Sequence, residues 1–286
     1  YLCSMNVQKK LAFKIIRIQL SVLSKVSPRL TGKQSFKLFT TPITLPGHKK
    51  ISRFSTFEPL AFQWNNLWIR GYRCNAGAPK KALILHGFSS SVHTFDHFIE
   101  PLIQQGYEIL AFDAPAHGES EGKTAHALDY AAVITRIHQL YGPLDAYIAH
   151  SFGGLSLALA LENILVAPHV KVVFLAPATE TTTAIRKGMW MLGIQNQKIQ
   201  EALEKEILTV SGKPATWFSM RRAVQYTRAN ILWVHDADDD ITPIDDVHPI
   251  INDKHPHILF HLTSGLGHRK IYRDPDVMQH IVSFLS

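Results

Sequence analysis

Cysteine is scarce in this chain of 286 residues, which contains only Cys3 and Cys74. Two cysteines cannot build a disulfide framework or a four-cysteine zinc site, so a core must hold the fold, and the chain is long enough to bury one. The sequence also lacks a run of about 18 uncharged apolar residues, which a membrane-spanning helix would need. Lys14 and Arg17 interrupt the longest apolar stretch near the start, which also argues against a signal peptide. We therefore expect a cytoplasmic protein, with peripheral attachment to a membrane as an alternative.

Acidic residues are absent before Glu58, whereas the same stretch carries eleven lysine and arginine residues. The remainder holds 19 basic and 23 acidic residues, so the net charge of +7 divides into +11 and −4. A mildly acidic body therefore follows a basic N-terminal arm, residues 1–50. The body has no basic excess that would attract nucleic acid, and we expect no nucleic-acid partner.

The arm has the pattern of an amphipathic helix that ends at Pro28. Basic and small polar residues share one helical face: Lys10, Lys14, Arg17, Ser21 and Ser24. Apolar residues share another: Leu11, Ile15, Ile18, Val22 and Val26, widened by Phe13, Ile16, Leu20 and Leu23. Such a helix can lie on an anionic membrane surface. Alternatively, it packs on the body or on a second copy with its basic face in water. Nucleic-acid binding or organelle targeting by the arm is a third alternative. The sequence does not determine the oligomeric state.

Short apolar runs alternate with helical patterns through the body. Strands are predicted at 82–86, 107–112, 144–149, 170–175, 231–234 and 258–262, and helices at 92–105, 125–141, 152–166 and 276–285. Continuous apolar strands between helices are typical of a parallel sheet that is covered on both faces. The sequence thus predicts an α/β fold whose core comprises residues 51–176 and 230–286.

One interval, residues 177–229, contains no predicted strand and has helix-like stretches at 194–208 and 217–226. An insertion of this length between two sheet strands is typical of a helical cap. It is rich in large apolar side chains: Met189, Trp190, Met191, Leu192, Trp217, Phe218 and Met220. These side chains either pack onto the main domain or line an apolar substrate pocket, and the two arrangements are compatible.

Ser151 stands where the third predicted strand gives way to a helix, within the sequence Ala149–Gly154, AHSFGG. A sharp turn of this kind holds its apical residue strained and presents a serine hydroxyl above the sheet. The residues two before and two after must be small. Gly153 meets this requirement and Ala149 nearly does, since it replaces the usual glycine and adds a methyl group. We interpret Ser151 as a nucleophile rather than a serine that caps a helix.

A serine nucleophile needs a base, and catalytic groups in this architecture gather beyond the carboxyl ends of the strands. His268 follows the last strand on a glycine-rich loop and is the predicted base. The base in turn needs a carboxylate, and the end of the fifth strand offers four: Asp236, Asp238, Asp239 and Asp240. The residues alone do not select among them.

The oxyanion of a tetrahedral intermediate requires two aimed N–H donors. One is the backbone N–H of Phe152, directly after the nucleophile. The other belongs to the loop after the first strand, where Gly87 permits a sharp turn, and the N–H of Phe88 is the candidate.

Four blocks of the body resemble the serine hydrolases of the α/β-hydrolase superfamily: His86–Phe88, Phe112–Ser120, the turn at Ser151, and the aspartate-rich strand end with Gly267–His268. The resemblance runs from about Ile51 to the end of the chain and keeps the family's order of serine, acid and histidine. It implies the α/β-hydrolase fold and assigns the acid to Asp239, with Asp238 as the alternative. It also implies that Asp113 and His117 brace the site.

The resemblance implies a carboxylic-ester hydrolase that acts on a small to medium apolar acyl ester through an acyl-enzyme. Thioesterase, amidase, aminopeptidase and carbon–carbon hydrolase activities use the same machinery in the family and remain alternatives. A non-catalytic binding protein with an inherited pocket is the rival class. The family's dehalogenases and epoxide hydrolases use an aspartate nucleophile, so Ser151 excludes them.

Neither a metal nor a cofactor is predicted. His93 and His97 form an i, i+4 pair without the glutamate of zinc proteases, and we interpret them as residues of a surface helix. No glycine-rich phosphate loop is present.

Overall fold

The computed structural model describes residues 7–43 and 53–286, with side chains from Phe13 onward, as two compact units. The larger unit comprises Pro42–Thr179 and Met220–Ser286, and the smaller combines the residues up to Thr41 with Glu180–Ser219. Cys3, the side chain of Lys10 and the expected end of the arm at residue 50 lie outside the described residues and side chains.

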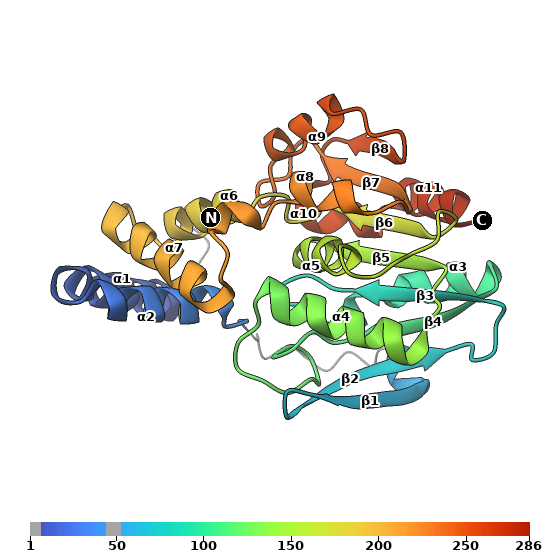
Figure 1. The fold of residues 1–286 in the computed structure, drawn as a ribbon, viewed down its shortest axis with the longest axis horizontal. Helices are drawn as coiled ribbons and strands as arrows, with labels where there is room; N and C mark the ends of the chain where they lie inside the picture. The colour runs from blue at the N-terminus through green and yellow to red at the C-terminus, as the bar shows by residue number, and fades with distance from the viewer. Residues whose placement is uncertain (1–6, 44–52) are drawn as a thin grey trace. The chain divides into compact units, whose positions relative to one another are not determined.

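The larger unit contains one sheet, whose strands follow the order β1-β2-β4-β3-β5-β6-β7-β8 (Figure 1). The strands are β1 (Glu58–Trp64), β2 (Leu67–Cys74), β3 (Lys80–Leu85), β4 (Tyr107–Phe112), β5 (Ala146–His150), β6 (Lys171–Leu175), β7 (Asn230–Asp236) and β8 (Ile258–Thr263). From β4 to β8 neighbouring strands pair in parallel, whereas β1 and β2 add an antiparallel hairpin at one edge. This is the mostly parallel sheet that the alternation of patterns predicted.

The six predicted strands correspond to β3–β8, but the hairpin β1–β2 was not predicted. Its strands are only half buried, so they contain no continuous apolar run. The signal that marks them is the turn between Trp64 and Leu67, where Asn65 and Asn66 both adopt positive φ, 47° and 62°. Two such residues are typical of a tight hairpin turn, because asparagine tolerates the left-handed region.

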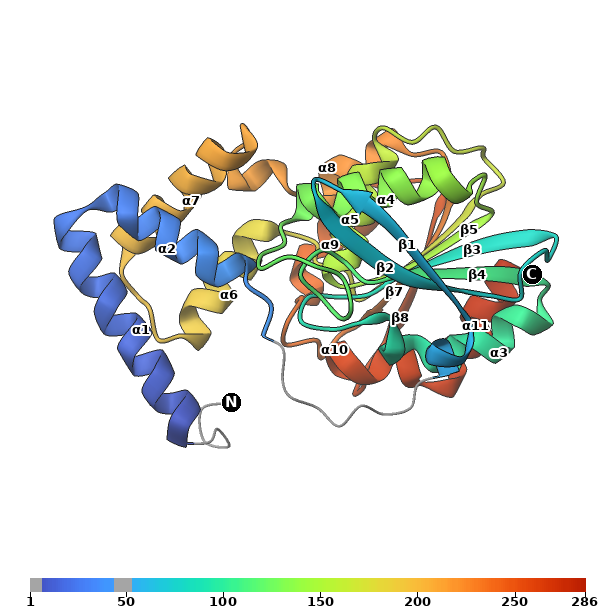
Figure 2. The same ribbon diagram turned by 90° about the horizontal axis from the view of Figure 1, so that it is seen from below.

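Helices cover both faces of the sheet, with α4, α5 and α8 on one side and α3, α10 and α11 on the other (Figure 2). The helices of this unit are α3 (Ile99–Gln104), α4 (Ala127–Tyr141), α5 (Phe152–Leu161), α8 (Met220–Ala223), α9 (His248–Asn252), α10 (Gly267–Lys270) and α11 (Pro275–Leu285). The predicted helix 92–105 is a 3₁₀ segment, Val92–Phe98, followed by α3. Buried residues of α3 and α11 form a hydrophobic core with residues of the strands.

The smaller unit consists of four main helices, α1 (Val7–Val26), α2 (Pro28–Thr40), α6 (Thr181–Met191) and α7 (Gln197–Ser211). Pro28 does not end the helical part of the arm, as the sequence predicted, but begins a second helix. Proline is tolerated at the first helical position, where its missing N–H costs nothing, and the Ser27 side chain caps the new helix by accepting from the N–H of Leu30. No helix in the described part of the chain is long and apolar enough to cross a membrane.

The arm packs on the inserted helices. Leu20 of α1 is buried in one cluster with Ile185 and Met189 of α6 and Leu203 of α7. Helix α2 approaches α7 so closely that a Cβ on Gly32 would lie 2.5 Å from the carbonyl oxygen of Ala202. The expected division into an arm (1–50) and a separate cap (177–229) therefore differs from the compact units, since arm and insertion share one apolar core and the insertion proper is Glu180–Ser219.

Candidate active site

The carboxyl ends of the parallel strands bring the predicted residues to one edge of the sheet. Strands β3 and β5 pair Leu85 with Ala149, so the loop after β3 starts beside the turn that carries Ser151. Strands β7 and β8 pair Asp236 with Thr263, so the aspartate-rich loop starts beside the loop that leads to His268. Through β6, which pairs with both β5 and β7, the same sheet edge also brings together Ser151 and His268, which lie 117 residues apart.

Ser151 occupies a strained turn between β5 and α5. Its φ of 54° and ψ of −120° are unusual for a residue with a side chain, and the surrounding packing must hold them. A Cβ on Gly153 would lie 2.6 Å from the carbonyl oxygen of His86, so only glycine fits two residues after the serine. Two residues before it, the methyl group of Ala149 is fully buried within β5. The turn has the geometry that the sequence predicted.

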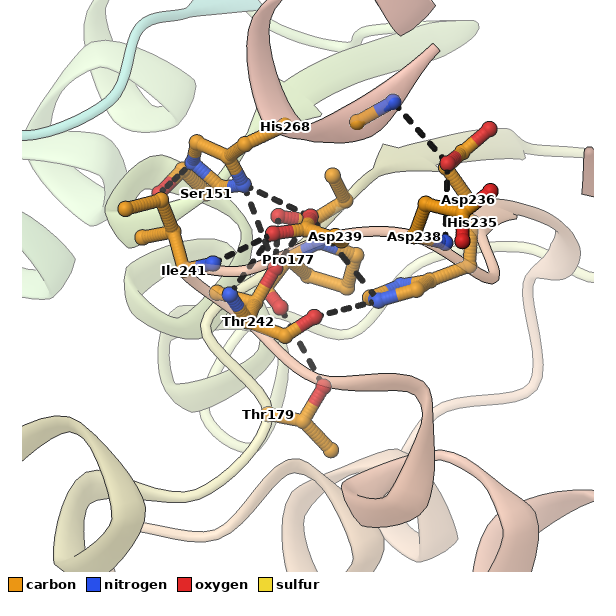
Figure 3. A network of polar contacts seen from close by, with 12 residues as sticks. Ser151, Pro177, Thr179, His235, Asp236, Asp238, Asp239, Ile241, Thr242 and His268 are labelled. Atoms are coloured by element: carbon orange, nitrogen blue, oxygen red, sulfur yellow. Dashed lines mark hydrogen bonds and ion pairs between the residues drawn. The ribbon is translucent and has the colours of Figure 1, made fainter. Parts of the chain in front are cut away.

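Hydrogen bonds join Ser151 to His268 and His268 to Asp239 (Figure 3). The Nε2 atom of His268 is 3.0 Å from the Oγ of Ser151, and its Nδ1 atom is 2.8 Å from Oδ2 of Asp239. In this arrangement Nδ1–H donates to the carboxylate and Nε2 accepts from the hydroxyl. All three residues are buried, so water competes little for these bonds.

Hydrogen bonds keep Asp239 ionised despite its burial. Its Oδ1 accepts from the backbone N–H groups of Ile241 and Thr242, both at 2.8 Å. Its Oδ2 accepts from the Thr242 hydroxyl at 2.7 Å as well as from His268. Burial alone would raise the pKa of Asp239, but the bond and charge of His268 and the donors of Thr242 hold it below the ordinary value.

The neighbouring carboxylates have other partners. Asp236 accepts four hydrogen bonds, from the N–H groups of Asp238, Leu266 and Gly267 and from the Thr263 hydroxyl. Asp236 thereby holds the loop that carries His268. Asp238 accepts from the N–H of Gly265 at 2.8 Å. Of the acids that the sequence left open, Asp239 is the one bonded to the imidazole of His268.

The loop after β3 lies against the serine. A Cβ on Gly87 would approach both the Cβ of Ser151 and the Nδ1 of His150 to 3.0 Å, so glycine allows the backbone to pass this close. The rings of Phe88 and Phe152 meet edge to face, with centroids 5.4 Å apart. The side chains of the two residues named for the oxyanion donors are therefore in contact.

Buried histidines brace this loop. His117 accepts from the N–H of Ser89 at 3.0 Å, and His86 accepts from the N–H of Ala114 at 2.9 Å. Each needs an unprotonated ring nitrogen, and burial lowers the pKa of both to about 4. Asp113 accepts from two backbone N–H groups, those of Val92 and Glu119, but burial still raises its pKa to about 6.

Two supporting residues escaped sequence reasoning. Thr242 donates to Asp239, and His150 binds the carbonyl oxygen of His268 at 3.1 Å through its Nε2. Burial lowers the pKa of His150 to about 3, so it is neutral. The position of Thr242, three residues after the acid, is the sequence signal for the first. No sequence signal marks His150, because its contact with His268 depends on the approach of two loops that are distant in the sequence.

Metal-binding groups do not gather in this part of the molecule. Within the described residues there is no cluster of three or more histidine, cysteine, aspartate or glutamate side chains that could hold a metal ion. His97, one of the i, i+4 pair, instead uses its Nε2 to bind the carbonyl oxygen of Tyr272.

A mostly parallel sheet with a strained serine after its fifth strand, and with an acid and a histidine after the last two, defines the α/β-hydrolase class. The chain belongs to the alpha/beta hydrolase family, whose model matches residues 82–270. No curated protein matches the sequence.

Solved structures share the fold at low sequence identity. An esterase from Pyrococcus furiosus, Pf2001, is 20% identical, with a TM-score of 0.62 over 86% of this chain and 95% of that one. A bacterial membrane phospholipase A is 15% identical, with a TM-score of 0.60 over 98% and 94%. The thioesterase domain from the curacin biosynthetic pathway is 14% identical, with a TM-score of 0.56 over 80% and 98%. Each shows the fold that this chain is similar to.

Proposed function

We propose that this protein is a serine hydrolase that cleaves carboxylic esters through an acyl-enzyme intermediate. The observation that carries the proposal is the pair of hydrogen bonds that joins Ser151 to His268 and His268 to Asp239. The serine lies on a turn where its φ is positive. A hydroxyl is a poor nucleophile until a base removes its proton, and an imidazole 3.0 Å away is placed to do so.

In the first half of the reaction, the Oγ of Ser151 attacks the ester carbonyl while its proton passes to Nε2 of His268. Asp239 accepts from Nδ1–H, which fixes the reactive tautomer and stabilises the imidazolium. The backbone N–H groups of Phe88 and Phe152 donate to the oxyanion. His268 then gives its proton to the leaving alcohol oxygen, and the acyl group stays on Ser151.

In the second half, His268 removes a proton from water, and the resulting hydroxide attacks the acyl carbonyl. Collapse of the second tetrahedral intermediate returns the proton to Ser151 Oγ and releases the carboxylic acid. Each step reuses the same base and the same oxyanion donors. No cofactor is needed, because the nucleophile, the acid and the base all belong to the chain.

Membership of the alpha/beta hydrolase family supports a hydrolase, and the Pyrococcus furiosus neighbour, an esterase, favours the ester bond. The curacin neighbour is a thioesterase, which keeps thioesters as the second candidate. A matched pair of substrates with the same acyl chain, one a nitrophenyl ester and one a coenzyme A thioester, distinguishes the two by kcat/KM. A series of acyl chain lengths then defines the preferred acid.

The nucleophile is tested with a fluorophosphonate probe, which reacts with activated serines. We expect the wild-type protein to be labelled and Ser151→Ala to lose both labelling and at least about ten-thousand-fold of its ester turnover, with its melting temperature retained. Ser156→Ala is the matched control, because that hydroxyl lies on α5, the helix that follows Ser151, and donates to the carbonyl oxygen of Phe152. Its labelling should not change.

Two results would contradict the proposal. Wild-type protein that neither reacts with the probe nor hydrolyses any ester or thioester of the series would instead indicate a binding protein. Labelling that persists in Ser151→Ala would place the nucleophile elsewhere.

A further inference from the structure

Helix α1 is apolar on two opposite faces. Towards the inserted helices it presents Leu20, which is buried in the core of the smaller unit. On its outward side, four aliphatic residues recur at steps of three, four and four and so share one face. They are Ile15, Ile18, Val22 and Val26, which are 47%, 52%, 57% and 76% exposed. We call these four residues the outer stripe.

The outer stripe is not needed to hold the helix in place. The opposite face of α1 supplies that packing, and the side chain of Asn196 adds a hydrogen bond to Ser24. A helix packed on protein and a helix lying on a membrane were two of the alternatives that the sequence left open for the arm. The structure divides the apolar residues of α1 into two sets, so the inner set serves packing and the outer set stays open to solvent.

Basic residues flank the stripe. At about 100° per residue, Lys14 and Lys25 project within roughly 40° of Ile18, and both are exposed. Helix α2 packs beside α1 (Figure 2), and its residues Arg29 and Lys33 are exposed as well. No acidic residue precedes Glu58 in the chain, so the basic charge of this surface is not offset by its own helices.

We propose that the outer stripe docks the protein on an anionic lipid bilayer, with α1 lying in the plane of the interface. Aliphatic side chains would enter the boundary between headgroups and acyl chains, and the flanking lysines would meet negatively charged headgroups. Each base near such a surface contributes a factor of roughly five to the partition coefficient, and salt weakens this part. The contribution of the aliphatic residues is insensitive to salt.

Charge favours the bilayer over a second copy of the chain. If two copies paired stripe against stripe, Lys14 and Lys25 of one would face the same lysines of the other. An anionic headgroup layer presents the opposite charge to the same residues. The proposal concerns a face remote in sequence from Ser151 and does not depend on the proposed activity.

The experiment is sedimentation with vesicles of phosphatidylcholine mixed with phosphatidylglycerol, at low and high salt, and with vesicles of phosphatidylcholine alone. Full-length protein should bind the anionic vesicles at low salt and bind them more weakly at high salt. The double variant Ile18→Glu, Val22→Glu should bind at least about tenfold more weakly, because it removes aliphatic surface and adds negative charge.

The matched control is Leu140→Glu, Leu165→Glu, which makes the same chemical change at two exposed leucines of the larger unit. It should bind as the wild type does. Ser151→Ala should also bind normally, which separates docking from catalysis. If the double variant melts lower than the wild type, Lys14→Gln, Lys25→Gln replaces it and should weaken binding to anionic vesicles only.

Three results would overturn the proposal. The first is full-length protein that does not sediment with anionic vesicles even at low salt. The second is stripe variants that sediment with these vesicles as well as the wild type does. Finally, a wild-type dimer that Ile18→Glu, Val22→Glu converts to a monomer, without vesicle binding by either, would identify the stripe as an interface between copies.

Discussion

Asp239 and Asp236 are three residues apart, yet their carboxylates have different partners. Asp239 receives the ring of His268 and the hydroxyl of Thr242, whereas Asp236 receives donors from the loop that precedes His268. One carboxylate is placed to control the tautomer of the histidine, and the other fixes its position. Replacing each aspartate by asparagine tests these two roles separately.

Asp239→Asn should lower ester turnover on the order of 10³- to 10⁴-fold while the fold survives. An amide at this position can turn its NH₂ group towards Nδ1 of His268, which favours the tautomer that carries its proton on Nε2 and cannot accept from Ser151. The measurement is kcat/KM for a soluble chromogenic ester, together with the melting temperature.

Asp238→Asn is the control, because an amide oxygen can still accept the N–H of Gly265. It should stay close to wild-type activity. Asp236→Asn should lower the melting temperature and the activity together, since its two oxygens accept four hydrogen bonds and an amide keeps only one oxygen. If Asp238→Asn were the inactive variant and Asp239→Asn the active one, the assignment of the acid would be wrong.

Gly32 of α2 allows the backbones of α2 and α7 to approach each other closely. Besides the carbonyl oxygen of Ala202, the Cβ of Glu206 would lie 3.2 Å from a Cβ on Gly32. Two segments that are far apart in the sequence thus pack with their backbones nearly in contact. A side chain at position 32 must push them apart.

Gly32→Val should reduce the free energy of unfolding by at least about 2 kcal/mol, because the clash involves backbone atoms that cannot move independently. The matched control is Lys33→Val, which introduces the same β-branched residue at the next, exposed position of α2. Chemical denaturation should show a large loss for the first and a change within about 0.5 kcal/mol for the second. Equal stability of the two variants would mean that α2 does not pack on α7 in solution.

The whole molecule keeps several ionisable groups neutral in its interior near the site. His86, His117 and His150 have pKa values of about 4, 4 and 3, all lowered chiefly by burial, against an ordinary value of 6.5. Asp113 is shifted the other way, since burial raises its pKa from 3.8 to about 6. These shifts make the stability of the larger unit dependent on pH.

Acidification from about pH 6.5 to about pH 4 should destabilise the protein. In this pH window the three histidines are protonated in the unfolded chain but stay neutral in the folded chain. Their contribution to the free energy of unfolding therefore falls as the pH falls. Asp113 opposes this, because the folded state holds its proton more tightly than the unfolded state does. For these four groups, three protons against one correspond to a net loss of roughly 2.7 kcal/mol per pH unit. Burial also lowers the pKa of His235, which acts in the same direction.

Urea unfolding at a series of pH values measures this slope. A free energy of unfolding that stays level or rises as the pH falls through this window would contradict the burial of neutral histidines. The Ser151→Ala variant should show the same slope as the wild type, because the effect does not involve turnover.

Local sequence determined most of the larger unit and the site. Continuous apolar runs identified β3–β7, because a strand buried on both faces must be apolar throughout. The edge strand β8 was identified from its apolar residues as well, although only Ile258 of this strand is buried. The small residues around Ser151 identified the strained turn between β5 and α5, because strand and helix crowd each other there. The position of His268 after the last strand placed it at the carboxyl edge. These features depend on residues close together in the chain, which is why a pattern reports them.

Tertiary contacts decided three other matters. The residues alone left four neighbouring carboxylates open and the family resemblance favoured Asp239, whose bond to His268 depends on how the loop after β7 turns towards the loop after β8. The half-buried hairpin β1–β2 acquires its place only by pairing with β4. The two apolar faces of α1 could be told apart only when the inserted helices covered one of them. In each case the deciding contact joins segments distant in the chain, and packing rather than local pattern selects the partner.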